Sequence, residues 1–109
     1  MATSNQRTDE TYADGTALTK LLGESPKVKI LASLLSESDV DLNVTDIAEL
    51  AGLHRTTVYD HLDDLTDLGV VVETRTVGGS PMYQINRDSD VAEGLAQLEW
   101  DLLDAIAEE

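Results

Sequence analysis

The chain has 109 residues, the size of one ordinary domain with a single hydrophobic core. Its 22 acidic residues outnumber its 7 basic ones, so the formal net charge is −15, far from the basic footprint of most nucleic-acid-binding domains. Apolar residues make up 41% of the chain, which is enough for a packed core. The lack of cysteine excludes a disulfide scaffold, a thiolate metal site and a cysteine nucleophile.

Neither the first residues nor the apolar segments predict export or a membrane span. Residues 1–10 are polar, unlike the basic and then apolar start of a signal peptide. No apolar run approaches the roughly 20 residues that cross a bilayer. We therefore expect a soluble protein of the cytoplasm.

The acidic residues are spread along the whole chain, and lysine is rare. Only Lys20, Lys27 and Lys29 occur, there is no phenylalanine, and small residues are common. This composition is typical of organisms with multimolar salt in the cytoplasm, where the Debye length falls to about 3 Å at 1 M and self-repulsion is screened. We interpret the chain as halophilic and archaeal.

The first third of the chain predicts an arm and two helices. Residues 1–15 have almost nothing to bury, which predicts a mobile N-terminal arm. Residues 17–22 predict a short helix that ends at Gly23. Ser25 and Pro26 suit the capping and first positions of a second helix. The apolar spacing of that helix predicts one buried face with Ile30 beside it, made of Val28, Leu31, Leu34 and Leu35.

Two further helices follow a polar loop, which we expect at residues 36–43. Thr45 is expected to cap the third helix, and Gly52 to end it. A fourth helix begins near His54 and carries one apolar stripe, formed by Val58, Leu62, Leu65 and Leu68. Two helices joined by a three-residue turn that contains glycine form the helix-turn-helix pattern.

The hydrophobic period then changes from that of a helix to that of a strand. Residues 70–77 are rich in β-branched side chains, residues 78–81 favour a turn, and residues 82–86 can return antiparallel. A hairpin directly after the second helix of a helix-turn-helix is a wing. One long helix, from about Ser89 to Ala107, completes the pattern.

These stretches, in this order and spacing, resemble the winged helix-turn-helix transcriptional regulators, and in particular small ArsR-like or MarR-like regulators of haloarchaea. The resembling segments cover about half of the chain and read SPKVKILASLL (25–35), VTDIAELAGLHRTTVYDHLDDLTDLG (44–69) and VVVETRTVGGSPMYQIN (70–86). The resemblance implies an α+β, mainly helical fold. A winged helix-turn-helix domain with a two-stranded wing would occupy residues 16–87, and a long C-terminal dimerisation helix residues 88–109.

The resemblance also places the DNA contacts. The recognition helix would span about residues 54–68 with its first turn in the major groove, and the wing, residues 74–83, would lie on the DNA backbone or in the minor groove. A helical wheel independently sets Thr56 opposite the buried Val58. The residues expected to contact DNA are His54, Arg55, Thr56, Thr57, Tyr59, Arg75, Thr76, Gly79 and Ser80.

Two windows of the sequence contain no acidic residue at all. The first, residues 50–59, contains Arg55, and the second, residues 74–87, contains Arg75 and Arg87. The windows coincide with the start of the fourth helix and with the wing. Their position therefore favours an anionic partner.

The remainder of the recognition helix argues in the other direction. Asp60 lies close enough to the first turn to meet DNA, where it would repel phosphate or accept a hydrogen bond from cytosine N4. Asp63 and Asp64 either oppose DNA in the same way or form a solvated helix side. The pattern leaves open whether DNA binding tolerates these three carboxylates.

No catalytic or metal-binding pattern emerges. His54 and His61 are two helical turns apart and lack a third ligand at a suitable spacing, so we expect no metal. We expect His54 to cap its helix or touch phosphate, and His61 to lie at the edge of the core. The chain is too short to combine this fold with a deep cleft, and it has no glycine-rich phosphate loop. We expect neither enzymatic activity nor a cofactor.

The last helix carries an apolar seam of two residues per heptad, formed by Val91, Leu95, Leu98, Leu102 and Ala105. Residues 88–109 include eight acidic and no basic residues, so this helix is not expected to contact DNA. It either folds back on its own domain or pairs two chains, which would set two recognition helices about 34 Å apart. We expect the homodimer, and we expect Trp100 to pack on the first helix of either chain.

Together these features predict a homodimeric regulator of transcription that binds duplex DNA without a cofactor. Two alternatives stay open, because the fold also serves other purposes. One is a winged-helix module that binds a protein of the transcription machinery. The other is an acidic inhibitor that mimics DNA. The sequence does not identify the operator, an effector, or the direction of regulation.

Overall fold

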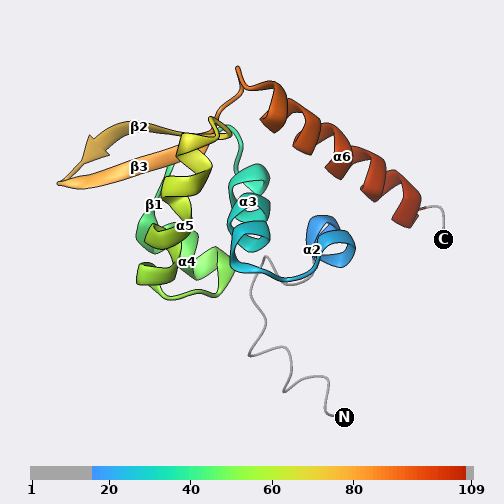
Figure 1. Ribbon diagram of the computed structural model, residues 1–109, viewed down its shortest axis with the longest axis horizontal. Coiled ribbons are helices and arrows are strands. Elements are labelled where there is room, and N and C mark those ends of the chain that lie inside the picture. Colours follow the sequence, from blue (N-terminus) through green and yellow to red (C-terminus); the bar gives the residue numbers. More distant parts are fainter. Residues whose placement is uncertain (1–15, 108–109) are drawn as a thin grey trace, which may run out of the picture.

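Helices of one half of the molecule pack on a small sheet, and a long helix leaves it at the C-terminal end (Figure 1). The computed structural model describes residues 16–107; the arm expected at residues 1–15 lies outside them. The elements follow in the order α2 (Ala17–Leu22), α3 (Pro26–Ser36), β1 (Leu42–Asn43), α4 (Val44–Ala51), α5 (Arg55–Asp67), β2 (Val71–Val77), β3 (Ser80–Ile85) and α6 (Asp90–Ala107). The expected mainly helical α+β fold, a winged helix-turn-helix with a C-terminal helix, is confirmed.

The N-terminal cap predicted for α3 is confirmed, whereas the one predicted for α4 is wrong. Ser25 caps α3 by accepting a hydrogen bond from the Val28 N–H at 3.4 Å, with Pro26 at the first helical position as predicted. The cap of α4 is Asn43 rather than Thr45, because the Asn43 side chain accepts the Asp46 N–H at 2.8 Å. The helix therefore begins two residues earlier than the sequence suggested.

The turn between α4 and α5 has the expected three residues. Gly52 ends α4 with a φ of 70°, a left-handed conformation that favours glycine. In α5, Val58 and Leu62 are at most 2% exposed and Leu65 is also buried, so the predicted stripe faces the core. Leu68 does not continue the stripe: α5 ends at Asp67, and Leu68 is 68% exposed.

The sheet has three antiparallel strands in the order β1-β3-β2, one more than expected. Leu42 pairs with Tyr83 and Asn43 with Met82, so the end of the predicted loop is a short strand beside the wing. A strand of two residues is too short to show an alternating pattern. It closes one edge of the wing hairpin against the helical part of the domain.

The wing hairpin turns at two glycines. Gly78 and Gly79 have φ values of 56° and 83°, the pair of positive values that a type I′ turn requires. The turn is shorter than predicted, because Ser80 and Pro81 already belong to β3. Nearer its base, β2 contains a bulge at Thr74, since Glu73 pairs with Tyr83 and Arg75 with the next residue, Met82.

The core gathers side chains from every described element. The largest fully buried ones are Leu18, Ile30, Leu34, Ile47, Leu62, Val58 and Val71. On α3 the buried face is centred on Ile30 and Leu34, whereas Val28 and Leu31 are only half-buried. The predicted face was therefore rotated, because α3 contacts α2, α4, α5 and β3 rather than one neighbour.

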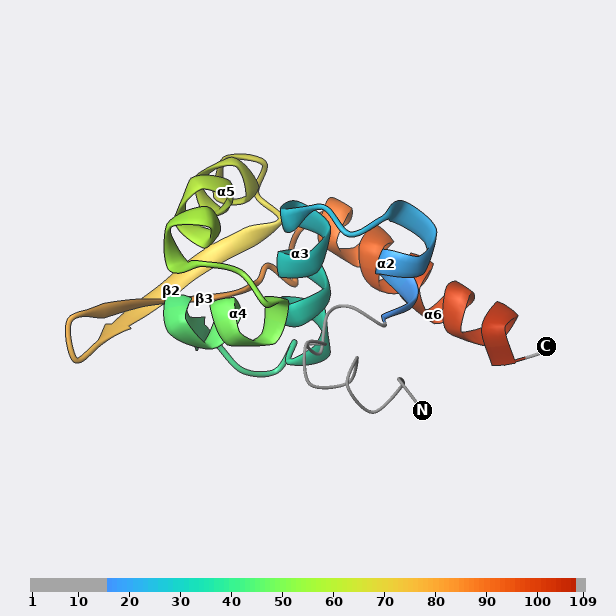
Figure 2. The same ribbon diagram turned by 90° about the horizontal axis from the view of Figure 1, so that it is seen from below.

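Helix α6 packs on its own domain along only part of its apolar surface. Ala92 is buried, and Leu95, Leu98 and Leu102 are half-buried against the core, with α2 in contact with α6 (Figure 2). Val91, by contrast, is 58% exposed, and Ala105 is exposed too. Trp100 is 66% exposed and lines a pocket described below, so it is not buried against the first helix of its own chain; its packing on the first helix of a second chain stays a prediction.

Asn86 makes four hydrogen bonds at the junction between β3 and α6. Its backbone N–H donates to the Val70 carbonyl at 3.0 Å, and its side-chain amide donates to the Gly69 carbonyl at 2.9 Å. Its side-chain oxygen accepts the Asp88 N–H at 3.1 Å, and its carbonyl accepts the Ser89 N–H at 3.0 Å. The start of α6 is thereby tied to the segment that links α5 to β2.

Candidate nucleic-acid interface

The first turn of α5 presents a polar surface without an acidic side chain. His54 occupies the capping position but makes no side-chain cap hydrogen bond, so it does not cap the helix in the way we expected. Arg55 and Thr56 are exposed, and Thr57 is half-buried. Tyr59, one turn further, is 42% exposed. These side chains can donate to base edges or to phosphate oxygens.

Arg55 differs from the other arginines that the structure describes, because it has no hydrogen-bond or ion-pair partner among residues 16–107. Arg87 pairs with Asp39 at 3.0 Å, and Arg75 with Asp41 at 2.9 Å. An unpaired guanidinium keeps all five of its N–H donors for a ligand. Arg55 is thus the side chain of this surface best prepared for a bidentate contact.

Residues 74–83, which we call the outer wing, contain no acidic residue. Arg75 is the single charged side chain among them. Thr76, Gly79 and Ser80 are exposed on the outer wing, as is Val77, at 48%. Arg75 is the cation that sequence reasoning assigned to this surface. Its guanidinium is exposed, but it is already engaged within the chain.

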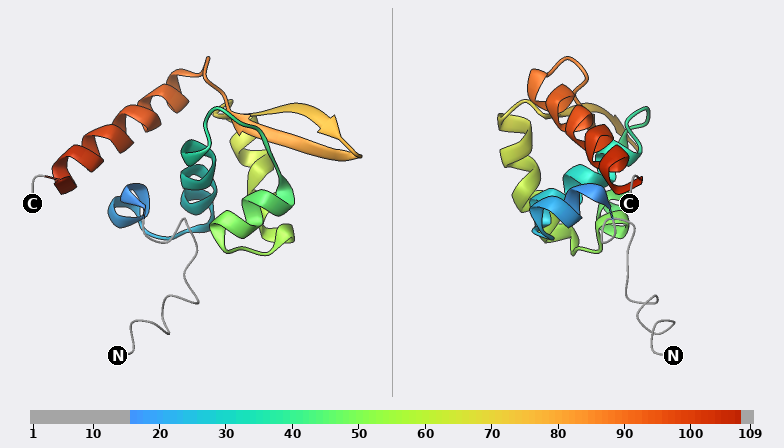
Figure 3. Two further views of the ribbon diagram at one scale, coloured as in Figure 1. Left: turned by 180° about the vertical axis from the view of Figure 1, so that it is seen from behind. Right: turned by 90° about the vertical axis from the view of Figure 1, so that its right-hand side faces the viewer.

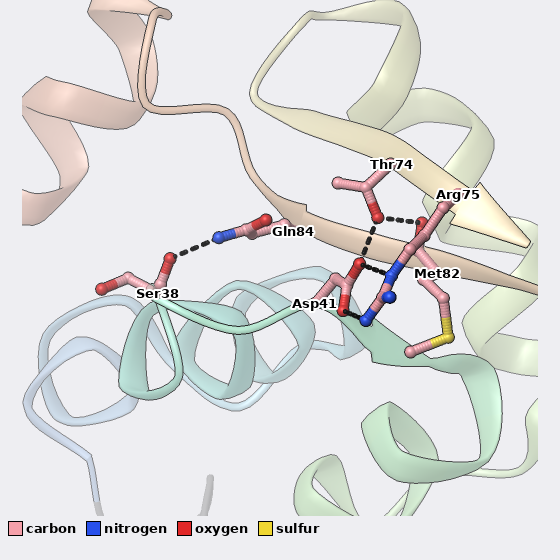
Figure 4. A network of polar contacts seen from close by, with 6 residues as sticks. All are labelled: Ser38, Asp41, Thr74, Arg75, Met82 and Gln84. Atoms are coloured by element: carbon pink, nitrogen blue, oxygen red, sulfur yellow. Dashed lines mark hydrogen bonds and ion pairs between the residues drawn. The ribbon is translucent and has the colours of Figure 1, made fainter. Parts of the chain in front are cut away.

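Asp41, from the loop before β1, holds the base of the wing (Figure 4). Arg75 donates from Nε to Asp41 Oδ2 at 2.9 Å and from Nη2 to Oδ1 at 3.1 Å. The Thr74 hydroxyl donates to the same carboxylate. Neighbouring residues of a regular strand point to opposite faces, but the bulge at Thr74 lets both side chains reach one carboxylate. We call this set of three residues the Asp41 clamp.

The clamp is charged under ordinary conditions. The hydrogen bonds from Arg75 and then Thr74 lower the pKa of Asp41 from 3.8 to about 2, and Asp41 in turn raises the pKa of Arg75. The Asp41 side chain is only 10% exposed, whereas that of Arg75 is 64% exposed. Asp41 takes two of the five N–H donors of Arg75, so the other donors can still meet a phosphate.

A second ion pair concerns one of the three carboxylates that oppose DNA binding. Lys27 at the start of α3 meets Asp64 of α5 at 2.8 Å and lowers the pKa of that carboxyl group. The Asp64 side chain is still 58% exposed, but its charge is paired with Lys27. Asp60 and Asp63 are exposed and have no such partner in the described structure.

Tyr83 shows how close α5 lies to the base of the wing. Burial is the main cause that raises the pKa of its hydroxyl, and the neighbouring Glu73, Tyr59 and Asp63 add to the shift. The acidic Glu73 and Asp63 are thus near Tyr83, one on β2 and the other on α5. The acid-free surface consists of the first turn of α5 and the outer wing, and it does not include these two residues.

These two surfaces occupy the same end of the molecule, and α6 lies at the opposite end (Figure 3). Sequence reasoning found Arg55 and the outer wing from the gaps between acidic residues. It missed Asp41, which is 34 residues from Arg75 and gives no local signal. It also missed the pairing of Lys27 with Asp64.

Other chemistry finds little support in the described residues. His61 lies at the edge of the core, as expected, and its Nδ1 atom is buried without a hydrogen-bond partner in residues 16–107. Within the same range no three His, Asp or Glu side chains gather around a point where a metal could bind. No helix of this range is long and apolar enough to span a membrane.

Comparison with known families identifies the central segment. Residues 29–75, from α3 into β2, match the family model of the IclR helix-turn-helix domain. This supports the winged helix-turn-helix part of the resemblance described above, whereas the ArsR-like or MarR-like and haloarchaeal assignments stay predictions.

The chain was also compared with curated proteins and with solved structures. No curated protein matches this sequence. Among solved structures, the chain is similar to Sso10a-2, a DNA-binding protein from Sulfolobus solfataricus, with 18% sequence identity and a TM-score of 0.48. The similarity covers 73% of this chain and 87% of that one.

Proposed function

We propose that this chain is a transcriptional regulator that binds duplex DNA sequence-specifically as a homodimer. The observation that carries the proposal is the exposed, acid-free first turn of α5, with an unpaired Arg55, inside an IclR-type helix-turn-helix domain. In this geometry α5 enters the major groove by its first turn. Because the DNA of an archaeal cell lies in the cytoplasm, the proposal places this regulator in the cytoplasm.

The contacts divide into two kinds. Arg55, Thr56, Thr57 and Tyr59 read base edges from α5, and His54 meets phosphate. On the wing, Arg75 offers its remaining donors to the backbone, while Thr76, Gly79 and Ser80 allow a close approach of the hairpin. Base contacts give specificity and phosphate contacts fix position, so α5 carries the sequence preference.

The dimer is formed by the side of α6 that carries the predicted seam. Val91 and Ala105 are exposed there, and Leu95, Leu98 and Leu102 are half-covered by their own domain. Helix α2, which contacts α6, also carries two leucines that are about half exposed, Leu21 and Leu22. A second chain would cover what the first leaves exposed, and pairing two domains raises DNA affinity through effective concentration.

The DNA contact is tested by binding to the upstream region of the gene, measured by fluorescence anisotropy across a KCl series. Arg55→Ala is expected to weaken binding at the preferred site by about 1–3 kcal/mol, roughly 5- to 150-fold. Lys20→Ala is the matched control: it removes one positive charge from α2, away from α5. Equal binding by both variants and the parent would refute the proposal and favour the protein-interaction module or the DNA mimic.

The dimer is tested by Val91→Asp combined with Ala105→Asp. Both side chains are exposed in the single chain, so the double variant keeps the fold. It is expected to sediment as a monomer and to lose most of its DNA affinity. A variant that stays dimeric would move the interface away from α6, and a monomer that binds as tightly as the parent would refute the coupling.

A further inference from the structure

A pocket of about 350 Å³ lies between α6 and the rest of the domain, on the side of α6 away from the seam. Leu35 at the end of α3 and Ile85 at the end of β3 line it from the domain. From α6 it is lined by Ala96, Glu99, Trp100 and Leu103. Its volume falls at the small end of the range of about 300–1,000 Å³ that is common for small-molecule sites.

Glu99 is the unusual side chain of this pocket. It lies between Ala96 and Leu103 on the apolar surface of α6, because residues three and four positions apart share a helix face. It is half-buried, it has no hydrogen-bond or ion-pair partner in the described structure, and burial raises its pKa. A carboxylate partly withdrawn from water without a partner is unfavourable, and such groups are often found where a ligand binds.

Trp100 adds the second feature. It is the only tryptophan of the chain, it is 66% exposed, and its indole lines the same pocket. The indole face attracts a cation more strongly than any other aromatic side chain does. Glu93 contributes another carboxylate to the lining. Arg87 also lines the pocket, but Asp39 neutralises it at 3.0 Å.

We propose that this pocket binds a small organic cation, an amine or quaternary ammonium group on a compact apolar body. The cationic group meets the Glu99 carboxylate and the Trp100 indole, and the apolar body lies against Leu35 and Ile85. The site is distinct from the DNA surface and does not depend on the DNA-binding proposal.

A second copy of the chain fits this pocket less well than a cationic ligand does. Residues 88–109 contain no basic side chain, so a partner's α6 would bring no counter-charge to Glu99. It would instead bring further carboxylates toward one that is already half-buried. The charge of the pocket therefore favours a cation from outside the protein.

The test uses the full chain, at the lowest KCl concentration at which circular dichroism shows the folded state. Phenethylammonium is titrated while the fluorescence of Trp100 is recorded, and 2-phenylethanol and phenylacetate serve as neutral and anionic counterparts of the same size. A saturable change is expected with the ammonium compound and at least tenfold weaker binding of the alcohol. Equal binding of the ammonium compound and the alcohol, or no saturation, would overturn the proposal.

Two variants locate the site. Glu99→Gln should weaken ammonium binding at least tenfold, whereas Asp104→Asn, the same loss of charge on α6 outside the pocket lining, should leave it unchanged. Equal effects of the two substitutions would refute the assignment. If Glu99→Gln impairs folding, the comparison of the three ligands on the parent chain decides. A Trp100 signal that follows protein concentration instead of ligand would show that a second copy fills the pocket, and would also overturn it.

Discussion

The α5–wing end and the α6 end of this molecule differ in how far their apolar side chains are buried and their carboxylates are paired. At the α5–wing end Val58 and Leu62 of α5 are buried to 2% exposure or less, and Asp41 and Asp64 are each paired with a cation. At the α6 end Val91 and Trp100 stay more than half exposed, and Glu99 is half-buried without a partner. The proposals above assign a second chain and a ligand to the exposed apolar area and the unpaired carboxylate of the α6 end.

The difference also separates the kinds of partner that each end suits. The α5–wing end offers unpaired donors on a polar surface, which suits a polyanion. The α6 end offers exposed apolar area together with carboxylates, which suits apolar surfaces and cations but repels nucleic acid. The net charge of −15 is therefore not evidence against DNA binding at the first turn of α5 and the outer wing, which carry no acidic residue.

The largest expected effect concerns burial. Leu62→Ala should lower the free energy of unfolding by about 2–5 kcal/mol, because it leaves a cavity in the core. Trp100→Ala, measured at low protein concentration and without ligand, should change it by no more than about 0.5 kcal/mol, because the side chain is mostly exposed. Urea denaturation measures both. A similar loss for Trp100→Ala would show that the α6 end is as complete as the other.

Salt should stabilise the whole fold. Screening reduces the repulsion among a net 15 negative charges, so the melting temperature in multimolar KCl should exceed that in 0.1 M KCl. A rise of at least about 4 °C is expected, which corresponds to about 1 kcal/mol for a domain of this size. Thermal melts by circular dichroism measure the rise. Identical midpoints would contradict the halophilic interpretation.

Arg75 should contribute to DNA affinity without contributing to sequence preference. Arg75→Ala removes the donors that the Asp41 clamp leaves available for phosphate, so binding to all sequences should weaken by a similar factor and the salt slope should fall by about 1. Anisotropy titrations with the preferred site and a scrambled site measure both quantities. A loss confined to the preferred site would mean that the wing reads bases.

The smallest expected effect is the pH dependence of the Asp41 clamp. The folded-state pKa of Asp41, about 2, lies below its usual 3.8, so the clamp stabilises the fold above about pH 4 and loses its effect as the pH falls toward 2. The melting temperature of Asp41→Asn should therefore be below that of the parent at pH 7, and the difference should shrink steadily as the pH falls from 4 through 2. Asp60→Asn, which removes an exposed carboxylate, serves as the control. A difference that does not shrink between pH 4 and pH 2 would show that Asp41 acts through packing.

Most of the fold could be predicted because its signals are local. The Ser25 cap, the Gly52 stop and the buried stripe through Val58 and Leu62 each depend on residues within a few positions of one another. The glycine pair at the wing tip is another such signal, since only its positive φ values permit so short a turn. The order of these signals along the chain was sufficient to predict a winged helix-turn-helix architecture.

What could not be predicted depends on residues that are distant in the sequence. Strand β1 exists because β3 pairs with it, and the Asp41 clamp exists because a bulge directs Thr74 and Arg75 to the same carboxylate. The sequence predicted that the whole apolar seam of the last helix pairs with a second chain. In the structure its own domain covers part of that seam, and Trp100 lines a pocket. For the candidate DNA surface, the gaps between acidic residues located the region but did not distinguish the unpaired Arg55 from the paired Arg75.

The hydrogen bonds of Asn86 have a consequence for DNA spacing. They fix the base of α6 to the residues just after α5, so the direction of α6 and the direction of the recognition helix are set together. An 18-residue helix is about 27 Å long, and a tilt of about 10° at its base displaces its far end by about 5 Å. In a dimer held by α6, that displacement is larger than the 3.4 Å rise of one base pair. If two chains pair through α6 as proposed, the hydrogen bonds of Asn86 help to set the half-site separation that the dimer spans, and replacing Asn86 would change that separation.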